Sequence, residues 1–338
     1  MLKQFWNRLS LKRRLALVMI VTGLLLVTTI LAGVLAVVYR QYTGTLSRQQ
    51  ETLLEGLGQG IDDQLRASLD ALTGVAQVTP QQALTDRQAA QRFLANRTGI
   101  QSIFDNGLML FSRTGQLMAE TPSDPARTVW EFAEYPFFKQ ASSADKPTIS
   151  LPFRSTNPPY HAVVQFMAPV KNASGATIGF LSGGISLQQP NFLGSLAQRR
   201  IGSKGYLYLY SRDRTMLVHP DPTRILRQTS LPGVNHLLDR AIKGWSGSGM
   251  TVNSRGVEQI ASFRQLTQVP WILAATFPEH EAAAPLYNAI LLLVTLIVGL
   301  GSIGAGISWW LTQRLTAPLG DFAGHLQRLP QLSGAARY

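Results

Sequence analysis

Two long uncharged stretches near the ends of the chain constrain its fold more than any other feature. Residues 15–38, LALVMIVTGLLLVTTILAGVLAVV, contain no charged residue. A membrane-spanning helix needs about 20 apolar residues. Residues 286–311 form a second uncharged stretch of sufficient length. We therefore predict two transmembrane helices that flank a water-soluble domain.

The first stretch has an alternative interpretation as a cleaved signal peptide. The apolar part of a signal peptide is about 7–15 residues long and precedes a cleavage site with small residues. This stretch is longer, and Tyr39-Arg40-Gln41-Tyr42 follows it. A retained helix is therefore favoured.

Charge near the two stretches predicts their orientation. The segment before the first stretch contains basic residues and no acidic one, and the segment after the second contains three arginines and one aspartate. Because cytoplasmic flanks are enriched in Lys and Arg, we predict cytoplasmic termini and a central domain outside the cytoplasm. The net charge of +12 is then partly a sign of topology, and we expect no nucleic-acid partner.

A stripe of apolar residues follows the first stretch at mostly four-residue steps, which predicts a long helix. Its members are Leu46, Leu53, Leu57, Ile61, Leu65, Leu69 and Leu72. The stripe is typical both of a helix that packs on its own domain and of a stalk that pairs with a second copy. We expect each to hold in part, and so predict a homodimer through the stalk and the membrane helices.

The central domain then shows the same order of elements twice: two strands, a helical excursion and three strands. The predicted strands and helices are 82–97 (helix), 108–111, 116–119, 128–142 (helical), 148–153, 160–170, 176–187, 191–200 (helix), 206–210, 215–218, 231–243 (helical), 249–253, 257–266 and 271–277. Such short strands with tight turns favour antiparallel or mixed sheets. We predict an α+β fold with two tandem five-stranded modules.

Several sequence strings resemble the double Cache (dCache) sensor domains of bacterial receptors. They are Glu134–Ala141 with Lys146–Ser150, Ala168–Val170 with Gly175 and Gly179, Ile201–Tyr210 with His219-Pro220-Asp221, and Val269–Trp271 with Phe277-Pro278. Arg314–Leu319 resembles the start of a HAMP linker, and Leu319, Phe322, Leu326 and Leu329 continue at coiled-coil spacing. In a bacterial receptor of this kind, the predicted topology means an inner-membrane protein with a periplasmic domain.

The resemblance and the two stretches divide the chain into segments. These are 1–14, a basic stub; 15–38, the first membrane helix; 40–285, the sensor; 286–311, the second membrane helix; and 312–338, the HAMP-like start. Within the sensor, 40–78 is the stalk, 79–190 the membrane-distal module and 191–285 the membrane-proximal module. The names distal module and proximal module are kept below for these ranges.

The resemblance implies a ligand site in the distal module. Family members that bind amino acids hold the carboxylate with Arg, surround the ligand with aromatics and hold the ammonium with Asp. Here Tyr135, Phe137 and Gly184 stand where the family has Arg, Trp and Asp, which favours a neutral or aromatic ligand, although Arg154 could still hold an anion. The candidate ligand-binding residues are Trp130, Tyr135, Phe137, Phe138, Arg154, Tyr160, Phe166 and Gly184. The aromatic ones are equally typical of a core.

The sequence predicts no catalytic site, cofactor or metal site. The chain has no Cys, none of the five histidines falls in a metal-binding spacing, and no Gly-x-Ser-x-Gly elbow occurs. We therefore predict a sensor for a small molecule. The resemblance of the linker implies that the cytoplasmic output domain is a diguanylate cyclase. A histidine kinase or a chemoreceptor signalling domain is the alternative. The second hypothesis is an interaction domain that detects another exported protein and whose pocket is degenerate. A third, weaker hypothesis is an exported enzyme tethered to the membrane.

Overall fold

The computed structural model describes residues 11–125, 127–156, 160–228, 231–252, 256–279, 281, 287–299, 301–307 and 309–310. Most of the predicted basic stub and the HAMP-like segment lie outside these residues. The chain divides into two compact units. One contains Gly44–Ala282, and the other combines Met1–Thr43 with Ala283–Tyr338.

Within the described residues, two helices are long and apolar enough to cross a membrane. Helix α2 (Leu11–Gln77) includes the first uncharged stretch and continues as the predicted stalk. A second helix covers Tyr287–Ile307. The most apolar window of each has none of its residues buried within the protein. This exposure fits an apolar solvent around the two helices, because packed apolar helices of a water-soluble protein are buried.

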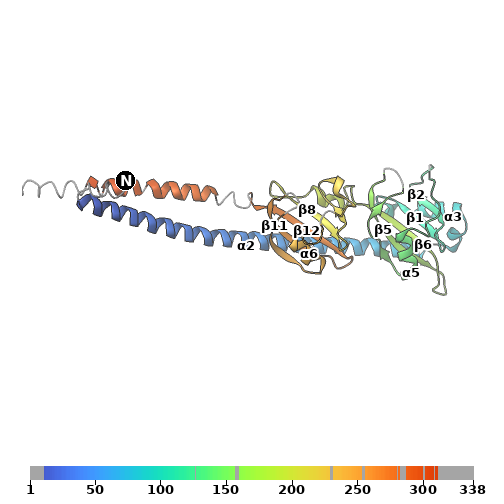
Figure 1. The fold of residues 1–338 in the computed structure, drawn as a ribbon. Coiled ribbons are helices and arrows are strands. Elements are labelled where there is room, and N and C mark those ends of the chain that lie inside the picture. The colour runs from blue at the N-terminus through green and yellow to red at the C-terminus, as the bar shows by residue number, and fades with distance from the viewer. Residues whose placement is uncertain are drawn as a thin grey trace, which may run out of the picture. The chain divides into compact units, whose positions relative to one another are not determined.

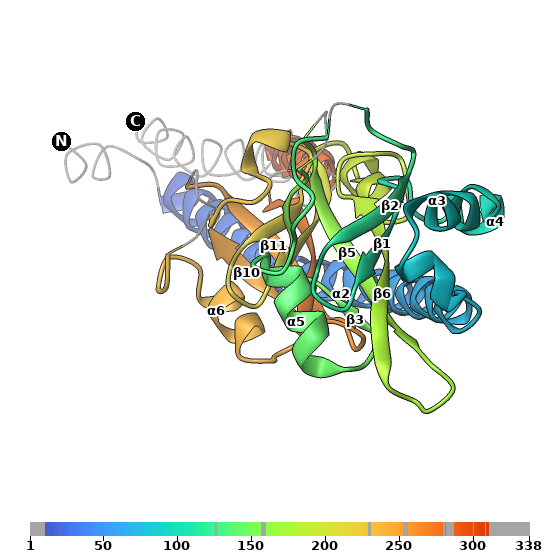
Figure 2. The same ribbon diagram turned by 90° about the vertical axis from the view of Figure 1, so that its right-hand side faces the viewer.

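The distal module is built on one antiparallel sheet (Figure 1). Its strands are β1 (Leu108–Ser112), β2 (Leu117–Thr121), β3 (Thr148–Ile149), β4 (Phe153–Arg154), β5 (Ala162–Lys171) and β6 (Thr177–Ser186), in the order β2-β1-β6-β5-β3 with β4 also paired to β5. Its helices are η1 (Gln81–Leu84), α3 (Arg87–Ala95), α4 (Thr98–Gln101) and α5 (Pro136–Ala144). In Figure 2, α3 lies beside β2 at the sheet edge, as their contacts confirm.

The proximal module repeats this architecture. Its strands are β7 (Arg200–Ile201), β8 (Gly205–Ser211), β9 (Met216–Val218), β10 (Gly247–Val252), β11 (Glu258–Gln265) and β12 (Trp271–Pro278), in the order β10-β11-β12-β8-β7 with β9 also paired to β8. Its helices are η2 (Gly194–Gln198), η3 (Pro222–Arg224) and α6 (His236–Ile242). The predicted α+β fold of two similar sheet modules after a long helix is confirmed.

Several predicted elements are shorter or divided. The helix predicted over 82–97 is divided into η1 and α3. The helical segments predicted over 128–142 and 231–243 correspond to the shorter helices α5 and α6. The helix predicted over 191–200 is only the 3-10 turn η2, because the Asn191 side chain accepts hydrogen bonds from the amides of Leu193 and Gly194 and holds a turn there. The strand predicted over 148–153 is interrupted between β3 and β4. Pro152 lies in the interruption and has no N–H for a sheet ladder.

Alternation along the strands gives each sheet two apolar faces. One face of each sheet packs against α2 and forms a shared core that includes Phe166 of β5 and Leu209 of β8. Leu54, Leu65 and Leu72 of α2 are buried in this core. The other faces have cores of their own, around Phe111 in the distal module and Phe263 in the proximal module.

The stalk stripe therefore packs mainly on its own domain, which is one of the two interpretations that the sequence predicted. Leu54 is 1% exposed, whereas its neighbour Leu53 is 43% exposed. Gly56 and Gly60 have nothing within 4 Å of where a side chain would begin. The side of α2 that carries these three residues is open in the single chain.

Candidate functional site

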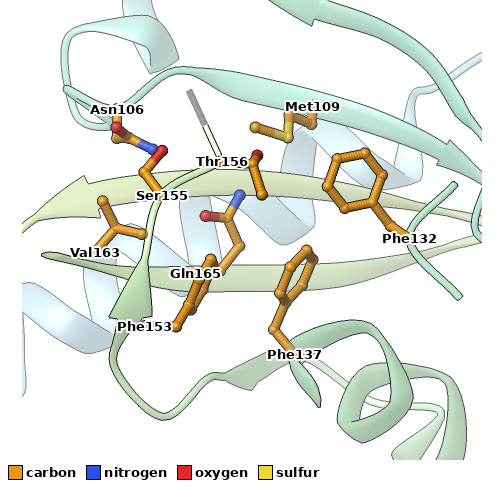
Figure 3. Close-up of a pocket in the computed structure, with 9 residues that line it drawn as sticks. All are labelled: Asn106, Met109, Phe132, Phe137, Phe153, Ser155, Thr156, Val163 and Gln165. Atoms are coloured by element: carbon orange, nitrogen blue, oxygen red, sulfur yellow. The ribbon is translucent and has the colours of Figure 1, made fainter. Parts of the chain in front are cut away.

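A small cavity lies in the distal module, on the sheet face away from α2. Its volume is about 10 Å³, roughly the room that one water molecule needs. The residues that line it are Asn106, Met109, Phe132, Phe137, Phe153, Ser155, Thr156, Val163 and Gln165 (Figure 3).

Strand geometry explains which side chains reach the cavity. Successive side chains of a strand point to opposite faces, so Val163 and Gln165 of β5 face the cavity while Val164 and Phe166 face α2. Met109 of β1 lies on the cavity side with the distal core of that face. The sheet thus forms the cavity floor.

Three phenylalanine rings form the apolar walls. Phe137, in the first turn of α5, stacks on Phe153 of β4 with ring centres 5.0 Å apart and an interplanar angle of 13°. Phe132 lies 6.0 Å from Phe137. Together the rings present flat apolar surfaces, which suit an apolar or aromatic ligand group.

A buried ion pair holds the segment that carries Phe132. The Arg127 Nε donates to Glu120 Oε1 at 2.5 Å, and both residues are buried. The Arg127 guanidinium also lies 5.9 Å from the centre of the Phe132 ring. The Phe132 amide donates to the Gly115 carbonyl at 2.8 Å, which places the ring against the β1–β2 turn.

Two amide side chains converge above Gly184 of β6. A side chain at position 184 would begin 2.9 Å from Asn106 Nδ2 and 3.0 Å from Gln165 Oε1. Gln165 is 2% exposed, and its Nε2 donates to Ser182 Oγ at 2.5 Å. Figure 3 shows the Gln165 amide directed into the space between the rings and Thr156.

Of the predicted ligand-binding residues, Phe137 lines the cavity and Gly184 lies directly beneath its amide groups. Tyr135 is half-buried, and its ring centre lies 5.9 Å from that of Phe137. Phe138 is buried against Phe111 and Phe180 in the core beneath α5. A ligand role for these residues stays a prediction.

The other predicted residues lie away from the cavity. Phe166 does not line this cavity, because it points to α2 and packs on Phe104 with ring centres 5.4 Å apart. Trp130 is 40% exposed beneath the Arg87 guanidinium. Arg154 is exposed and donates to the Tyr160 carbonyl at 3.1 Å, and Tyr160 is also exposed.

Sequence reasoning missed most of the cavity, including both amides. One signal was present: Gln165 interrupts the apolar strand Ala-Val-Val-Gln-Phe-Met-Ala-Pro-Val. A polar side chain in a strand buried on both faces needs a partner or a ligand. Asn106, Ser155 and Thr156 lie in loops, where periodicity gives no such signal.

Comparison with known proteins finds a Cache domain model that matches residues 37–286. A curated relative, the methyl-accepting chemotaxis protein PctB of Pseudomonas aeruginosa, is 26% identical over 221 residues. The match covers 62% of this chain and 32% of that receptor. The chain thus corresponds to about a third of the relative's length.

Two solved structures have the same fold. The ligand-binding domain of the Pseudomonas fluorescens chemoreceptor CtaA, in complex with L-isoleucine, is 19% identical with a TM-score of 0.57 and covers 72% of this chain and 97% of its own. The extracellular domain of the putative histidine kinase mmHK1S-Z3 is 14% identical with a TM-score of 0.57, covering 72% of this chain and 98% of its own.

Proposed function

The chain belongs to the Cache domain family, and from this membership we propose that it is a transmembrane signal receptor that senses a small molecule outside the cytoplasm. The observation that carries the proposal is the distal cavity, where two amides converge among three phenylalanine rings. Ligand pockets combine apolar walls with a few convergent polar groups in this way.

The topology of this receptor has two spans, cytoplasmic termini and a periplasmic sensor. Support comes from the two candidate membrane helices and from the basic flanks. Reporter fusions at Ala173, in the exposed turn between β5 and β6, and at Gln331 test it. Activity of a periplasmic reporter at Ala173 and of a cytoplasmic one at Gln331 is expected, and the reverse pattern would refute the scheme.

A ligand larger than water must open the cavity, since about 10 Å³ is present in this structure. Binding then shifts the protein from the closed state to an open one, by as much as the ligand prefers the open state. A thermal-shift screen of the 338-residue chain in nanodiscs tests this function. Hits should disappear in Phe137→Ala and persist in Phe138→Ala, whose ring lies in the neighbouring core.

The small cavity also supports a second candidate, a sensor of another exported protein. A filled pocket leaves recognition to exposed apolar side chains, and Trp130, Leu151 and Tyr160 are exposed in the same module. Pull-down from periplasm with wild type and a Trp130→Ser, Leu151→Ser double variant separates the two. A partner lost in the double variant, with no effect of Phe137→Ala, would favour this candidate.

We propose the open side of α2 as the contact in a parallel homodimer. Leu53 is exposed while Leu54 is buried in its own domain, and small residues at i and i+4, here Gly56 and Gly60, allow close approach of two helices. Leu53→Cys should crosslink between two copies in membranes, and Leu54→Cys should not. Equal behaviour of the two neighbours would contradict the proposed face.

The proposed output is a diguanylate cyclase that follows the HAMP-like segment. Its support is the resemblance of Arg314–Leu319 to a HAMP start. The relatives found are a chemoreceptor and a putative histidine kinase, so these two outputs are the alternatives. The coding sequence after Tyr338 decides among them: a GGDEF motif would support the cyclase, and a chemotaxis signalling domain or a kinase core would replace it.

A further inference from the structure

We propose that the distal cavity selects an uncharged ligand, which presents an N–H or O–H donor to Gln165 Oε1 and a flat apolar face to Phe137 and Phe153. This inference rests on the proposed sensing function and adds the chemical class of the ligand. Its carrying observation is the pair of neutral amides that occupies the space above Gly184.

None of the residues that line the cavity is charged. Arg127, which lies near the Phe132 ring, is paired with Glu120. A carboxylate or ammonium brought into this site would lose water without gaining an opposite charge, and that loss is strongly unfavourable.

The amides themselves have unused hydrogen-bonding capacity. Among the described residues, Gln165 Oε1 has no hydrogen-bond partner, because the Gln165 side chain bonds only through Nε2 to Ser182. The Asn106 side chain likewise has no protein partner within that part of the chain, although its backbone amide donates to the Gly184 carbonyl at 3.0 Å. A ligand N–H or O–H directed at Gln165 Oε1 therefore forms a hydrogen bond without displacing a protein donor.

The two amides also occupy the space that a carboxylate side chain at position 184 would enter, so such a side chain would have to displace them. A side chain there would begin within 3.0 Å of both amides, tighter than ordinary van der Waals contact. The chain therefore replaces an anionic partner for a ligand ammonium with neutral acceptor and donor groups. Selectivity then follows from charge, since amide, carboxylate and amidine groups have nearly the same shape.

Benzamide, benzoate and benzamidine make the matched test. They are neutral, anionic and cationic, and each carries the same ring for the phenylalanine walls. Binding is measured by ligand-observed NMR and titration with the 338-residue chain in nanodiscs. We expect benzamide to bind about tenfold more tightly than either charged probe, equivalent to about 1.4 kcal/mol.

Gln165→Glu provides the decisive variant, because it replaces the amide with an anion of the same size. The order should then invert, with benzamidine binding about tenfold more tightly than benzamide. Gln88→Glu, the same change at an exposed position on α3, should keep the wild-type order. If Gln165→Glu fails to fold, Asn106→Asp repeats the test at the half-buried amide.

The outcomes separate this inference from the function on which it rests. If benzoate or benzamidine binds wild type as well as benzamide, and Phe137→Ala abolishes that binding, the neutral class is overturned while small-molecule sensing stands. If no probe binds wild type and benzamidine does not bind Gln165→Glu, the cavity is not a ligand site. That result overturns both and favours the protein-sensing candidate.

Discussion

The distal and proximal sheets have the same strand order, but the faces that point away from α2 differ in chemistry. Strand pairing gives the correspondence. Met109 pairs with Ser182 and Gln165 with Gly184 in the distal sheet, as Tyr208 pairs with Ala274 and Ala261 with Thr276 in the proximal sheet. Gly184 and Thr276 thus stand at the same place in the two modules, and so do Gln165 and Ala261.

The proximal face is packed where the distal face has amides. Ala261 and Ala274 lie on this face beside Tyr208 and Phe263, and all four belong to one buried cluster with residues of α6. Tyr208 is 7% exposed, and its burial raises the pKa of its phenol well above the usual value.

The two modules are also attached to α2 by different interactions. The Asp62 carboxylate accepts hydrogen bonds from the Thr267 and Gln268 amides, at 2.9–3.0 Å, in the turn between β11 and β12. Gln50 and Glu51 bond to Ser262 and Ser248. Within the described residues, by contrast, no hydrogen bond or ion pair joins α2 to the distal sheet, which α2 contacts through apolar packing.

This contrast predicts different roles for the two modules when a ligand binds. Hydrogen bonds to a buried carboxylate are directional and fix the position of the turn. Apolar packing is non-directional and tolerates small sliding movements. We infer that the distal module changes on ligand binding, while the proximal module moves as one body with the part of α2 to which it is bonded.

The largest expected effect concerns amino acids as ligands. Tyr135 and Gly184 carry no charge that could pair with the carboxylate and the ammonium of an amino acid, and each missing pairing is worth about 1.5–3 kcal/mol. Calorimetry with L-isoleucine, the ligand of the CtaA structure, should show binding two to four decades weaker than micromolar, by the rule of about 1.4 kcal/mol per decade. Micromolar binding that vanishes in Tyr135→Ala would contradict this.

The next effect tests the attachment of the proximal module. Asp62→Ala leaves the Thr267 and Gln268 amides without their acceptor and should lower the unfolding free energy of this module by about 2–4 kcal/mol. Asp63→Ala, at the exposed neighbouring position, should change it by less than about 0.5 kcal/mol. Hydrogen exchange of the two amides measures the effect. If the Thr267 and Gln268 amides stay equally protected from exchange in Asp62→Ala, Asp62 does not fix this turn to α2.

A smaller effect concerns the buried hydroxyl of Thr276 on β12. Thr276 is 1% exposed, and its hydroxyl has no hydrogen-bond partner among the described residues. Thr276→Val removes this unsatisfied hydroxyl at nearly constant volume and should raise stability by about 1 kcal/mol. Thr251→Val is the matched control, because the Thr251 hydroxyl bonds to Asn235 Oδ1 at 3.0 Å. Thermal melting should show a lower stability for Thr251→Val than for wild type. A lower stability of both variants would show that the Thr276 hydroxyl has a hydrogen-bond partner.

The sequence predicted the fold better than the site, and the reason is physical. Periodicity reports burial, so it located β1, β5 and β8 and the buried stripe of Leu65 and Leu72. Each of these elements repeats one pattern over several residues. Loops such as the one that carries Ser155 have no period, and the structure alone places them over the sheet.

Two particular residues show where sequence reasoning stopped. Phe166 and Gln165 are neighbours, and aromatic character drew the prediction to Phe166, but strand alternation sends it to the α2 face. Leu53 and Leu54 are also neighbours, and the four-residue stripe contains Leu53, whereas the buried position is Leu54. The phase of a pattern, set by the tertiary partner, cannot be read from the pattern alone.

The smallest effect concerns two glutamates at the ends of β11 and β12. Glu258, which begins β11, and Glu279, which follows β12, share a hydrogen bond, and this contact with a like charge raises the pKa of Glu258 above 4.5. A carboxyl whose pKa is raised in the folded state contributes stability below pH 4.5, which is lost as pH rises through the raised value.

Glu258→Gln removes this pH dependence, because the amide mimics the protonated carboxyl at every pH. The melting temperatures of variant and wild type should agree below pH 4.5, and the variant should melt higher as the pH approaches about 7. Glu131→Gln, an exposed position in the distal module, keeps the pair and should follow the wild-type curve. The melting temperatures of Glu258→Gln and wild type could instead differ by the same amount at both ends of this pH range. Such a constant difference would mean that the substitution acts through packing. The repulsion between the two carboxylates would then play no part in the proximal module's response to pH.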